Sequence, residues 1–511
     1  MAKLKDYNGH YCESEYENAF LGFLEKAGWT YTAGNAIPRA SRHEVLLEAD
    51  FKEFLEENAP DLTAGEIDQL YDTVHLAGGE SDFATLHKLY GWMVFGIQFV
   101  PQNGLARMVP LINYDRPKKN IFRAVNQFVV EYTNNGQKET RRPDVLLFVN
   151  GMPLCIIELK NPAAANAIIH DAWEQITIRY WRDIPHLLHY CPLACISDGV
   201  KTRLGTVRTP YEHFYAWRRV EDGDKISALP FAETETLING VYSPARFLEI
   251  FRDYIYFQDS IYDSSEVEIV CRYPQFFAAR LLKDSIVKSV KSGSGKGGTY
   301  FGATGCGKTY TMAFLARQLA LRCPDVPEIG SPTIVMIVDR EDLQKQSAKL
   351  FTRSQEFLNL GQVAVVKNRA QLRDELGKRQ SGGFYICTIQ KFCDRKEDKI
   401  GLINNRRNII CFSDEAHRTQ LEHSKKIQFS KDSDENMKAL VSKPYAKVLR
   451  EAFPAATFVG FTGTPIAETY QTFGDEIDRY TMDQAVADGL TVSIKYHPRI
   501  AKVLLDKKKV K

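Results

Sequence analysis

The sequence predicts an α/β protein made of two successive units, a mixed sheet followed by a parallel sheet. Strand-like runs dominate residues 120–220, and a helix is expected between them near 163–182. After residue 265, short and uniformly apolar runs alternate with helices, which is typical of parallel strands buried on both faces. The 511 residues leave room for about three domains.

The composition is that of a soluble cytoplasmic protein. Charged residues make up 25% and hydrophobic residues 44%, and the formal charge is only +2. A polyanion-binding surface must therefore be a local basic patch. The ten cysteines lack paired metal-ligand spacing, which favours reduced core thiols. We see neither a signal peptide nor an apolar run of ~18 residues, so we expect no membrane span.

The first unit is predicted to open with helices. Residues 13–28 have helical spacing and end at a glycine, and residues 44–90 contain a capping box at Thr63 and Glu66. We place the unit boundaries at 1–260, 261–492 and 493–511.

Asp144, Glu158 and Lys160 lie on the two arms of a predicted hairpin, whose Asn-Gly pair is a strong turn signal. A two-residue turn would put the two carboxylates on opposite faces. An odd loop over 149–151, with a bulge, would put all three side chains on one face. We predict the odd loop.

Two carboxylates on one face, Asp144 and Glu158, can hold Mg²⁺, which activates water and stabilises a leaving phosphate oxygen. Lys160 can position that water or neutralise developing charge. The alternative is an edge strand with a simply solvated face, but the apolar run at 154–157 argues against it. The pattern predicts a nuclease.

The motif GATGCGKT at 302–309 follows a strand-like run and precedes a helix. Its glycines allow backbone N–H groups to surround phosphates, and the helix N-terminus adds positive potential. The alternative, a chance glycine-rich turn, is disfavoured by the motif DEAH downstream. The predicted nucleotide contacts are Gly302, Thr304, Gly305, Gly307, Lys308, which reaches the β/γ-phosphates, and Thr309, which ligates Mg²⁺.

The motif DEAH begins at the carboxyl end of another apolar strand, where α/β sheets bind ligands. Asp414 would hold Mg²⁺, Glu415 would orient and deprotonate the attacking water, and His417 would sense the nucleotide. The alternative is an acidic strand end with a solvated histidine.

These motifs resemble those of superfamily 2 helicases. By that resemblance Gln275 reads adenine, with Tyr273 available for stacking, although a surface glutamine is the alternative. VDREDL (338–343) and TIQKF (388–392) resemble motifs that touch the nucleic-acid backbone, and TGTP (462–465) one that couples ATP turnover to DNA movement. The alternative is that they are only loop residues after strands. The residues implied are Arg340, Thr388, Lys391, Thr462 and Thr464.

The whole series resembles the restriction (R) subunit of type I restriction-modification enzymes. It comprises a helix bearing Glu17, then NQFVVE (126–131), RRPD (141–144), IELKNP (157–162), SDGVKTRLGT (197–206) and the helicase motifs. The resemblance implies a PD-(D/E)xK restriction-endonuclease-like domain with a mixed sheet, followed by a RecA-like parallel-sheet helicase lobe. It also makes Glu17 an additional acidic residue of the nuclease site, the alternative being a solvated helix glutamate.

The family resemblance implies an ATP-dependent translocase and endonuclease that uses ATP and Mg²⁺. Its partners would be double-stranded DNA and the methyltransferase (M) and specificity (S) subunits, and it would cleave unmodified foreign DNA away from the recognition site. Alternatives are another nuclease–helicase, type III-like or for DNA repair, and a non-catalytic protein that binds only DNA or nucleotide. The nuclease-before-motor order favours the first.

Two departures from the family pattern carry expectations. The family has a QxxxY motif, whereas Gln175 and Tyr180 are five positions apart. We expect Gln175 to belong to the site, and about 100° of rotation per helical residue to turn Tyr180 away. We also expect residues 493–511 to begin a second lobe that is cut off, leaving an isolated chain deficient in ATPase activity because an arginine finger is missing.

Overall fold

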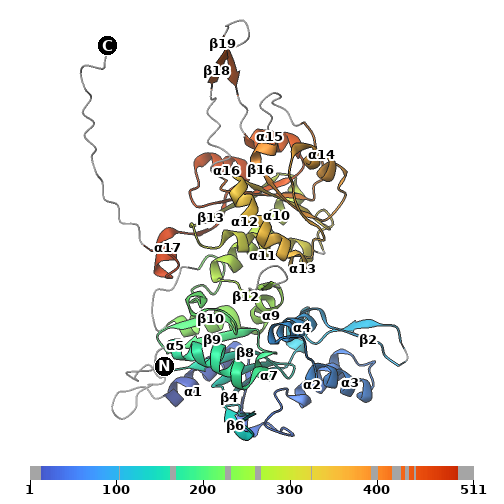
Figure 1. The fold of residues 1–511 in the computed structure, drawn as a ribbon, viewed down its shortest axis with the longest axis vertical. Coiled ribbons are helices and arrows are strands. Elements are labelled where there is room, and N and C mark those ends of the chain that lie inside the picture. The colour runs from blue at the N-terminus through green and yellow to red at the C-terminus, as the bar shows by residue number, and fades with distance from the viewer. Residues whose placement is uncertain are drawn as a thin grey trace, which may run out of the picture.

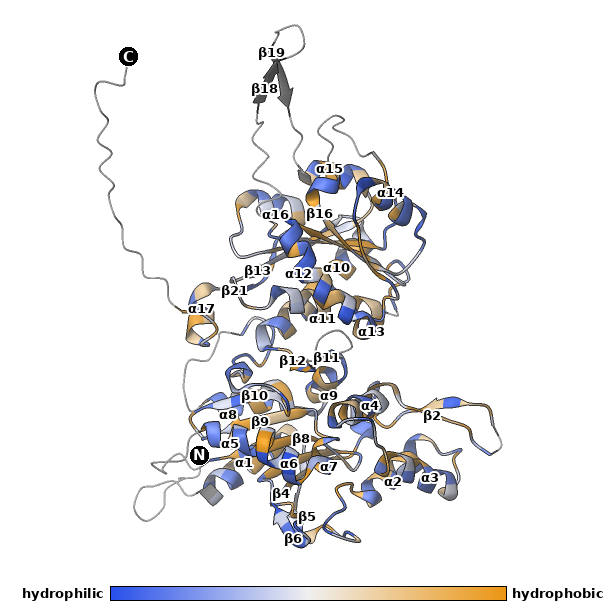
Figure 2. Ribbon diagram, in the orientation of Figure 1, coloured by the Kyte–Doolittle hydropathy of each residue, from blue (hydrophilic) through white to orange (hydrophobic). Residues whose placement is uncertain are grey.

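The computed structural model describes residues 13–102, 104–160, 169–224, 232–258, 266–323, 325–392, 401–416, 427–431, 437–441 and 445–492. Two sheets, each with its own helices, follow one another along the chain (Figure 1). Both sheets are apolar at their centres, and polar residues lie on the outer helices (Figure 2). No helix among the described residues is long and apolar enough to cross a membrane.

The first sheet is mixed and has six strands in the order β1-β4-β7-β8-β9-β10. The pairs β1–β4 and β8–β9 are parallel and the other three are antiparallel. Every residue of β7 and β8 is buried, so these strands form the centre of the core. The strands are β1 (Thr30–Ala33), β4 (Phe122–Asn126), β7 (Val145–Val149), β8 (Met152–Leu159), β9 (Leu193–Ser197) and β10 (Thr202–Thr206).

Helices and three short ribbons surround this sheet. The capping box of Thr63 and Glu66 is present and confirms that prediction. The α- and π-helices are α1 (Glu13–Ala27), α2 (Glu48–Asn58), α3 (Ala64–His75), α4 (Asp82–Phe95), α5 (Ile169–Glu174), a π-helix (Gln175–Tyr180), α6 (Trp181–Asp183), α7 (Pro185–Leu188), α8 (Glu233–Leu237), a second π-helix (Ile238–Tyr242) and α9 (Pro244–Asp253). The ribbons pair β2 (Ile97–Phe99) with β3 (Arg107–Val109), β5 (Val130–Asn134) with β6 (Gln137–Arg141), and β11 (Ile255–Gln258) with β12 (Val267–Val270).

The second sheet is wholly parallel, as predicted, and has seven strands in the order β15-β16-β14-β17-β20-β13-β21. Alternate residues of β14 enter two different hydrophobic clusters, so this strand is buried on both faces. The strands are β13 (Lys296–Gly302), β14 (Thr333–Val338), β15 (Val363–Val365), β16 (Phe384–Thr388), β17 (Ile409–Asp414), β20 (Thr457–Thr462) and β21 (Glu476–Tyr480).

Helices connect the parallel strands or flank them at the two ends of this unit. They are α10 (Tyr273–Ser292), α11 (Lys308–Leu321), α12 (Glu341–Arg353), α13 (Gln355–Leu358), α14 (Arg369–Lys378), α15 (Tyr445–Ala452), α16 (Ala467–Phe473) and α17 (Met482–Ala487). A separate hairpin pairs β18 (Ile427–Lys431) with β19 (Met437–Val441). Residues 493–511, expected to begin a second lobe, lie outside the described residues.

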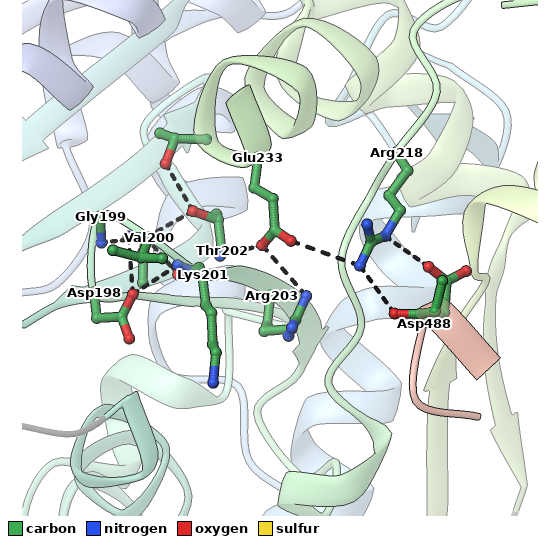
Figure 3. Close-up of polar contacts among 12 residues, drawn as sticks. Asp198, Gly199, Val200, Lys201, Thr202, Arg203, Arg218, Glu233 and Asp488 are labelled. Carbon is green, nitrogen blue, oxygen red and sulfur yellow. Dashed lines mark hydrogen bonds and ion pairs between the residues drawn. The ribbon is translucent and has the colours of Figure 1, made fainter. Parts of the chain in front are cut away.

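Polar contacts join the two units beside α17 (Figure 3). Arg218 lies 2.6 Å from Asp488 and 3.7 Å from Glu233. Glu233 in turn accepts a hydrogen bond of 3.0 Å from the backbone N–H of Thr202, at the start of β10. Next to Arg218, the guanidinium of Arg219 binds both carboxylate oxygens of Asp478 on β21, at 3.1 and 2.9 Å. The first unit is therefore tied to the last strand of the second sheet.

Candidate functional site

The turn between β7 and β8 differs from the predicted odd loop. Val149 pairs directly with Met152, so the turn has two residues, both left-handed: Asn150 at φ 50° and Gly151 at φ 78°. Its buried surroundings impose this shape. The Asn150 amide donates to the Leu111 carbonyl at 2.9 Å, and a Cβ on Gly151 would lie 2.3 Å from a backbone oxygen.

A β-bulge restores the parity that this turn would otherwise reverse. Phe148 pairs with Pro153, but Leu147 pairs with Cys155, so Leu154 is the extra residue of β8. Val145 then pairs with Ile157. The positions before and after that pair, Asp144 and Glu158, are thereby opposite each other. The predicted odd loop is wrong. The bulge at Leu154, rather than the loop, places Asp144 and Glu158 on one face of the sheet.

Asp144 and Glu158 meet at the end of the two central strands. The Asp144 carboxylate accepts a 2.8 Å hydrogen bond from the Leu159 N–H. The Glu158 side chain is 0% exposed on a strand flanked by β7 and β9, which contradicts the alternative of a solvated edge. Burial raises the pKa of Glu158 well above its usual value, and the neighbouring Asp144 carboxylate raises this pKa further.

Glu17 of α1 joins the same cluster. Its side chain is 9% exposed, which contradicts the alternative of a solvated helix glutamate. Its two oxygens accept hydrogen bonds from the side-chain amides of Asn126 at 2.6 Å and Gln127 at 2.7 Å. The Gln127 amide also lies 3.5 Å from Asp144. Sequence reasoning missed both amides, although the NQFVVE run was the available signal.

Lys160 and Gln175 complete the cluster around Glu158. The Lys160 ammonium lies 3.8 Å from a Glu158 oxygen and donates to the Gln175 side-chain oxygen at 2.9 Å. The Gln175 amide donates to the same Glu158 oxygen at 2.7 Å. The buried carboxylate is therefore held between a cation and an amide.

Tyr180 also reaches Glu158, contrary to the expectation that it turns away. Its hydroxyl donates to the second Glu158 oxygen at 2.8 Å, and the Gln175 amide lies 2.6 Å from that hydroxyl. The reason is the π-helix over 175–180. A π turn bonds residues five apart, so it brings these two side chains over one another where an α-helix would separate them.

The GATGCGKT loop joins β13 to α11. Gly305 and Gly307 are both left-handed at φ 84°. The Lys308 ammonium donates to the Gly302 carbonyl at 3.2 Å and lies 3.9 Å from a Glu415 oxygen. Thr309 follows in the first turn of α11. The loop thus folds around the lysine, with an acidic strand end in front of it.

That acidic strand end is the beginning of DEAH. Asp414 ends β17, is 9% exposed, and accepts a 3.0 Å hydrogen bond from the Glu415 N–H. Burial raises the pKa of Asp414 to about 6, against the opposing effect of Lys308. His417 lies outside the described residues.

TGTP lies beside the GATGCGKT loop because β20 is the strand between β17 and β13. The Thr462 hydroxyl accepts a 3.1 Å hydrogen bond from the Thr464 N–H. A Cβ on Gly463 would lie 3.4 Å from the Thr304 hydroxyl. Three strand ends thus meet at one edge of the parallel sheet.

Gln275 and Tyr273 are both buried at 3% exposure, which contradicts the alternative of a surface glutamine. The Gln275 amide lies 3.4 Å from the Gly307 carbonyl, so it touches the GATGCGKT loop. Tyr273 donates to Asp488 at 2.8 Å and is not open to a base, which corrects the stacking expectation. Instead, a cavity of about 410 Å³ opens beside Gln275 and is lined by Tyr215, Arg272 and Tyr310, among others.

The three residues expected to touch a nucleic-acid backbone differ in exposure. The Arg340 side chain is 64% exposed at the start of α12. Thr388 is 3% exposed at the end of β16, and the Lys391 ammonium donates to the Gln344 side chain at 3.1 Å. Only Arg340 of the three is therefore openly presented. The contact of these three residues and of the neighbouring main-chain N–H groups with DNA stays a prediction.

Comparison with known proteins matches both halves. Residues 10–213 match the family described as type I restriction enzyme R protein N terminus, and residues 274–511 match SWI2/SNF2 ATPase. The chain is 31% identical over 506 residues to the type I restriction enzyme HindI endonuclease subunit of Haemophilus influenzae, covering 95% of this chain. The chain is thus a homologue of type I restriction enzyme endonuclease subunits.

Two further proteins are similar to this chain. The chain is 29% identical to the putative type I restriction enzyme MjaIXP endonuclease subunit of Methanocaldococcus jannaschii, over 96% of this chain. The chain spans about half of each of these two relatives, 46% of their length. The fragment structure of a putative HsdR subunit from Vibrio vulnificus has 16% identity and a TM-score of 0.27, covering 72% of this chain and 56% of that one.

Proposed function

We propose that this R-subunit chain carries a metal-dependent DNA nuclease in residues 1–260 and an ATP-binding motor lobe in residues 261–492. The observation that supports it most is the meeting of Glu17, Asp144 and Glu158 with Lys160 at the end of the central strands. In a complete cytoplasmic enzyme with M and S subunits, ATP-driven translocation would precede cleavage of unmodified foreign duplex DNA.

The residues of the cluster fit Mg²⁺. Carboxylate oxygens are the ligands that a hard cation prefers. Asp144 and the buried Glu158 are like charges side by side, an arrangement that a divalent cation would relieve. Asp144 and Glu158 would hold the ion, and Glu17 would add a third carboxylate beside them. When bound, the metal would activate water and stabilise charge on the leaving phosphate oxygen.

The remaining side chains would orient the cluster. Lys160, next to Glu158, is placed to position water and to neutralise charge that develops on the phosphate. Gln175 and Tyr180 each donate to a different Glu158 oxygen, which fixes the plane of the carboxylate. The two donors thus present Glu158 in one orientation, which is the pre-organisation that catalysis needs.

The motor lobe would bind ATP with Mg²⁺ at the edge where β13, β17 and β20 end. Gly302, Thr304, Gly305, Gly307 and Lys308 would hold the phosphates, and Thr309 and Asp414 would hold the ion. Glu415 would orient the attacking water and His417 would sense the nucleotide. Gln275 would face the base, and Thr462 and Thr464 would couple turnover to movement. Arg340, Thr388 and Lys391 would lie along the DNA backbone.

The decisive experiment separates the two sites in the assembled enzyme. Glu158→Gln should abolish DNA cleavage and leave ATPase activity nearly unchanged, because the sites lie on different sheets. Lys308→Ala should abolish both. Glu174→Gln is the matched control, because Glu174 directly precedes Gln175, at the end of α5, but is half-exposed. Equal loss of ATPase activity in Glu158→Gln would refute the two-site proposal, and full cleavage by that variant would refute the nuclease assignment.

A further inference from the structure

Gln127 has a strained backbone at the edge of the candidate nuclease site. It directly follows β4 and adopts φ 50°, a left-handed conformation that non-glycine residues rarely take. Its N–H donates to the backbone carbonyl of Asp144 at 2.9 Å. Such strain persists only where the surroundings impose it, and it gathers at functional sites.

A segment of the same chain that is distant in the sequence, around Gly34, imposes this conformation on Gln127. Gly34 packs so closely that a Cβ there would lie 2.5 Å from the Asn126 carbonyl oxygen and 2.9 Å from that of Gln127. The backbone of 126–128 is therefore fixed in place by contact with Gly34, and the side chains of Asn126 and Gln127 both turn toward Glu17.

The Gln127 amide bridges two carboxylates. Its nitrogen lies 2.7 Å from a Glu17 oxygen and 3.5 Å from an Asp144 oxygen. A side-chain amide nitrogen carries two hydrogens, one for each carboxylate. The other Glu17 oxygen is held by Asn126, whose own side-chain oxygen accepts from the Tyr31 hydroxyl at 3.1 Å. Both carboxylate oxygens of Glu17 are thus bound by amides at the end of β4.

We propose that Gln127 is a positioning residue that sets the spacing of Glu17 and Asp144 for a divalent cation. As a neutral donor between two negative charges, it keeps them close before any cation arrives, so less rearrangement remains at binding. This inference rests on the proposed nuclease function. Residues that orient metal-binding carboxylates change metal affinity by about 10–100-fold when they are removed.

The test measures Mn²⁺ binding to the nucleotide-free full chain by titration calorimetry. Gln127→Gly removes the amide and relieves the backbone strain, so it should bind Mn²⁺ about 10–100-fold more weakly. Gln127→Asn tolerates the left-handed backbone but is one methylene too short to bridge, so its affinity should also fall. Asn135→Gly is the control, because Asn135 has the same backbone conformation, φ 49°, in the β5–β6 turn.

The outcomes separate this inference from the proposed function. If the wild-type chain shows no Mn²⁺ binding that Glu158→Gln removes, the nuclease proposal fails. If Glu158-dependent binding is present and Gln127→Gly and Gln127→Asn bind as tightly as wild type, only the positioning role fails. In the assembled enzyme, the cleavage rate of Gln127→Gly should recover at saturating Mn²⁺, whereas Glu158→Gln should stay inactive. An unrecovered rate with normal affinity would overturn the role in metal binding.

Discussion

Deleting Ile178 should convert the π turn into an ordinary α-helix without loss of the candidate nuclease site. Ile178 is 52% exposed on the π-helix, so its removal sacrifices little buried surface. The deletion gives Gln175 and the tyrosine the four-residue spacing of the family motif. Because the flanking segments keep their register, both hydrogen bonds to Glu158, now 2.7 and 2.8 Å, should survive.

If the π turn did not convert into an α-helix, the hydrogen bond lost from Glu158 would set the loss of cleavage activity. A deletion that did not absorb the π turn would rotate Tyr180 by about 100°. Glu158 would then lose one hydrogen bond, worth about 1.5–3 kcal/mol for a charged partner. That energy corresponds to about 10–150-fold in rate if it is expressed in the transition state.

The assay compares cleavage by assembled enzymes that carry the Ile178 deletion, Tyr180→Phe or no change. We expect the deletion variant to cleave within a few-fold of wild type, and Tyr180→Phe to lose at least about tenfold. A deletion variant as slow as Tyr180→Phe, with unchanged ATPase activity, would refute the idea that the π turn compensates for an extra residue.

Three further predictions concern stability. Gly151→Ala should destabilise the chain to urea far more than Gly136→Ala, because both residues are left-handed at φ 78° and 79° but only the first is crowded. Asp478→Ala should cost about 3–5 kcal/mol because it leaves Arg219 buried and unpaired; a smaller loss in Arg219→Met combined with Asp478→Leu would confirm the cause. Burial lowers the pKa of His186 from about 6.5 to about 4. Between these two pH values the imidazole binds a proton in the unfolded chain but not in the folded one, so stability falls as the pH falls. The urea midpoint should therefore drop between those values, and a flat profile would contradict the burial effect.

The sequence alone determined the features whose geometry is local. The GATGCGKT loop needs only glycines between a strand and a helix, and Asp414 needs only a buried strand that ends at it. Because every strand of that sheet is parallel, their carboxyl ends share one edge, and Gly302, Asp414 and Thr462 follow from their places in the chain. The D…ExK spacing likewise identified the two arms of one hairpin.

Only the tertiary structure decided which side chains meet around Glu158. One bulge at Leu154 puts Asp144 and Glu158 on the same face of the sheet. One π turn brings Tyr180 back to the side of Gln175, from which α-helical rotation would turn it away. Both devices absorb a single residue, and neither leaves a signal in hydrophobic periodicity. Gln127 depends on packing against Gly34, 93 positions away along the chain, because contact between distant segments alone makes its left-handed backbone the favourable one.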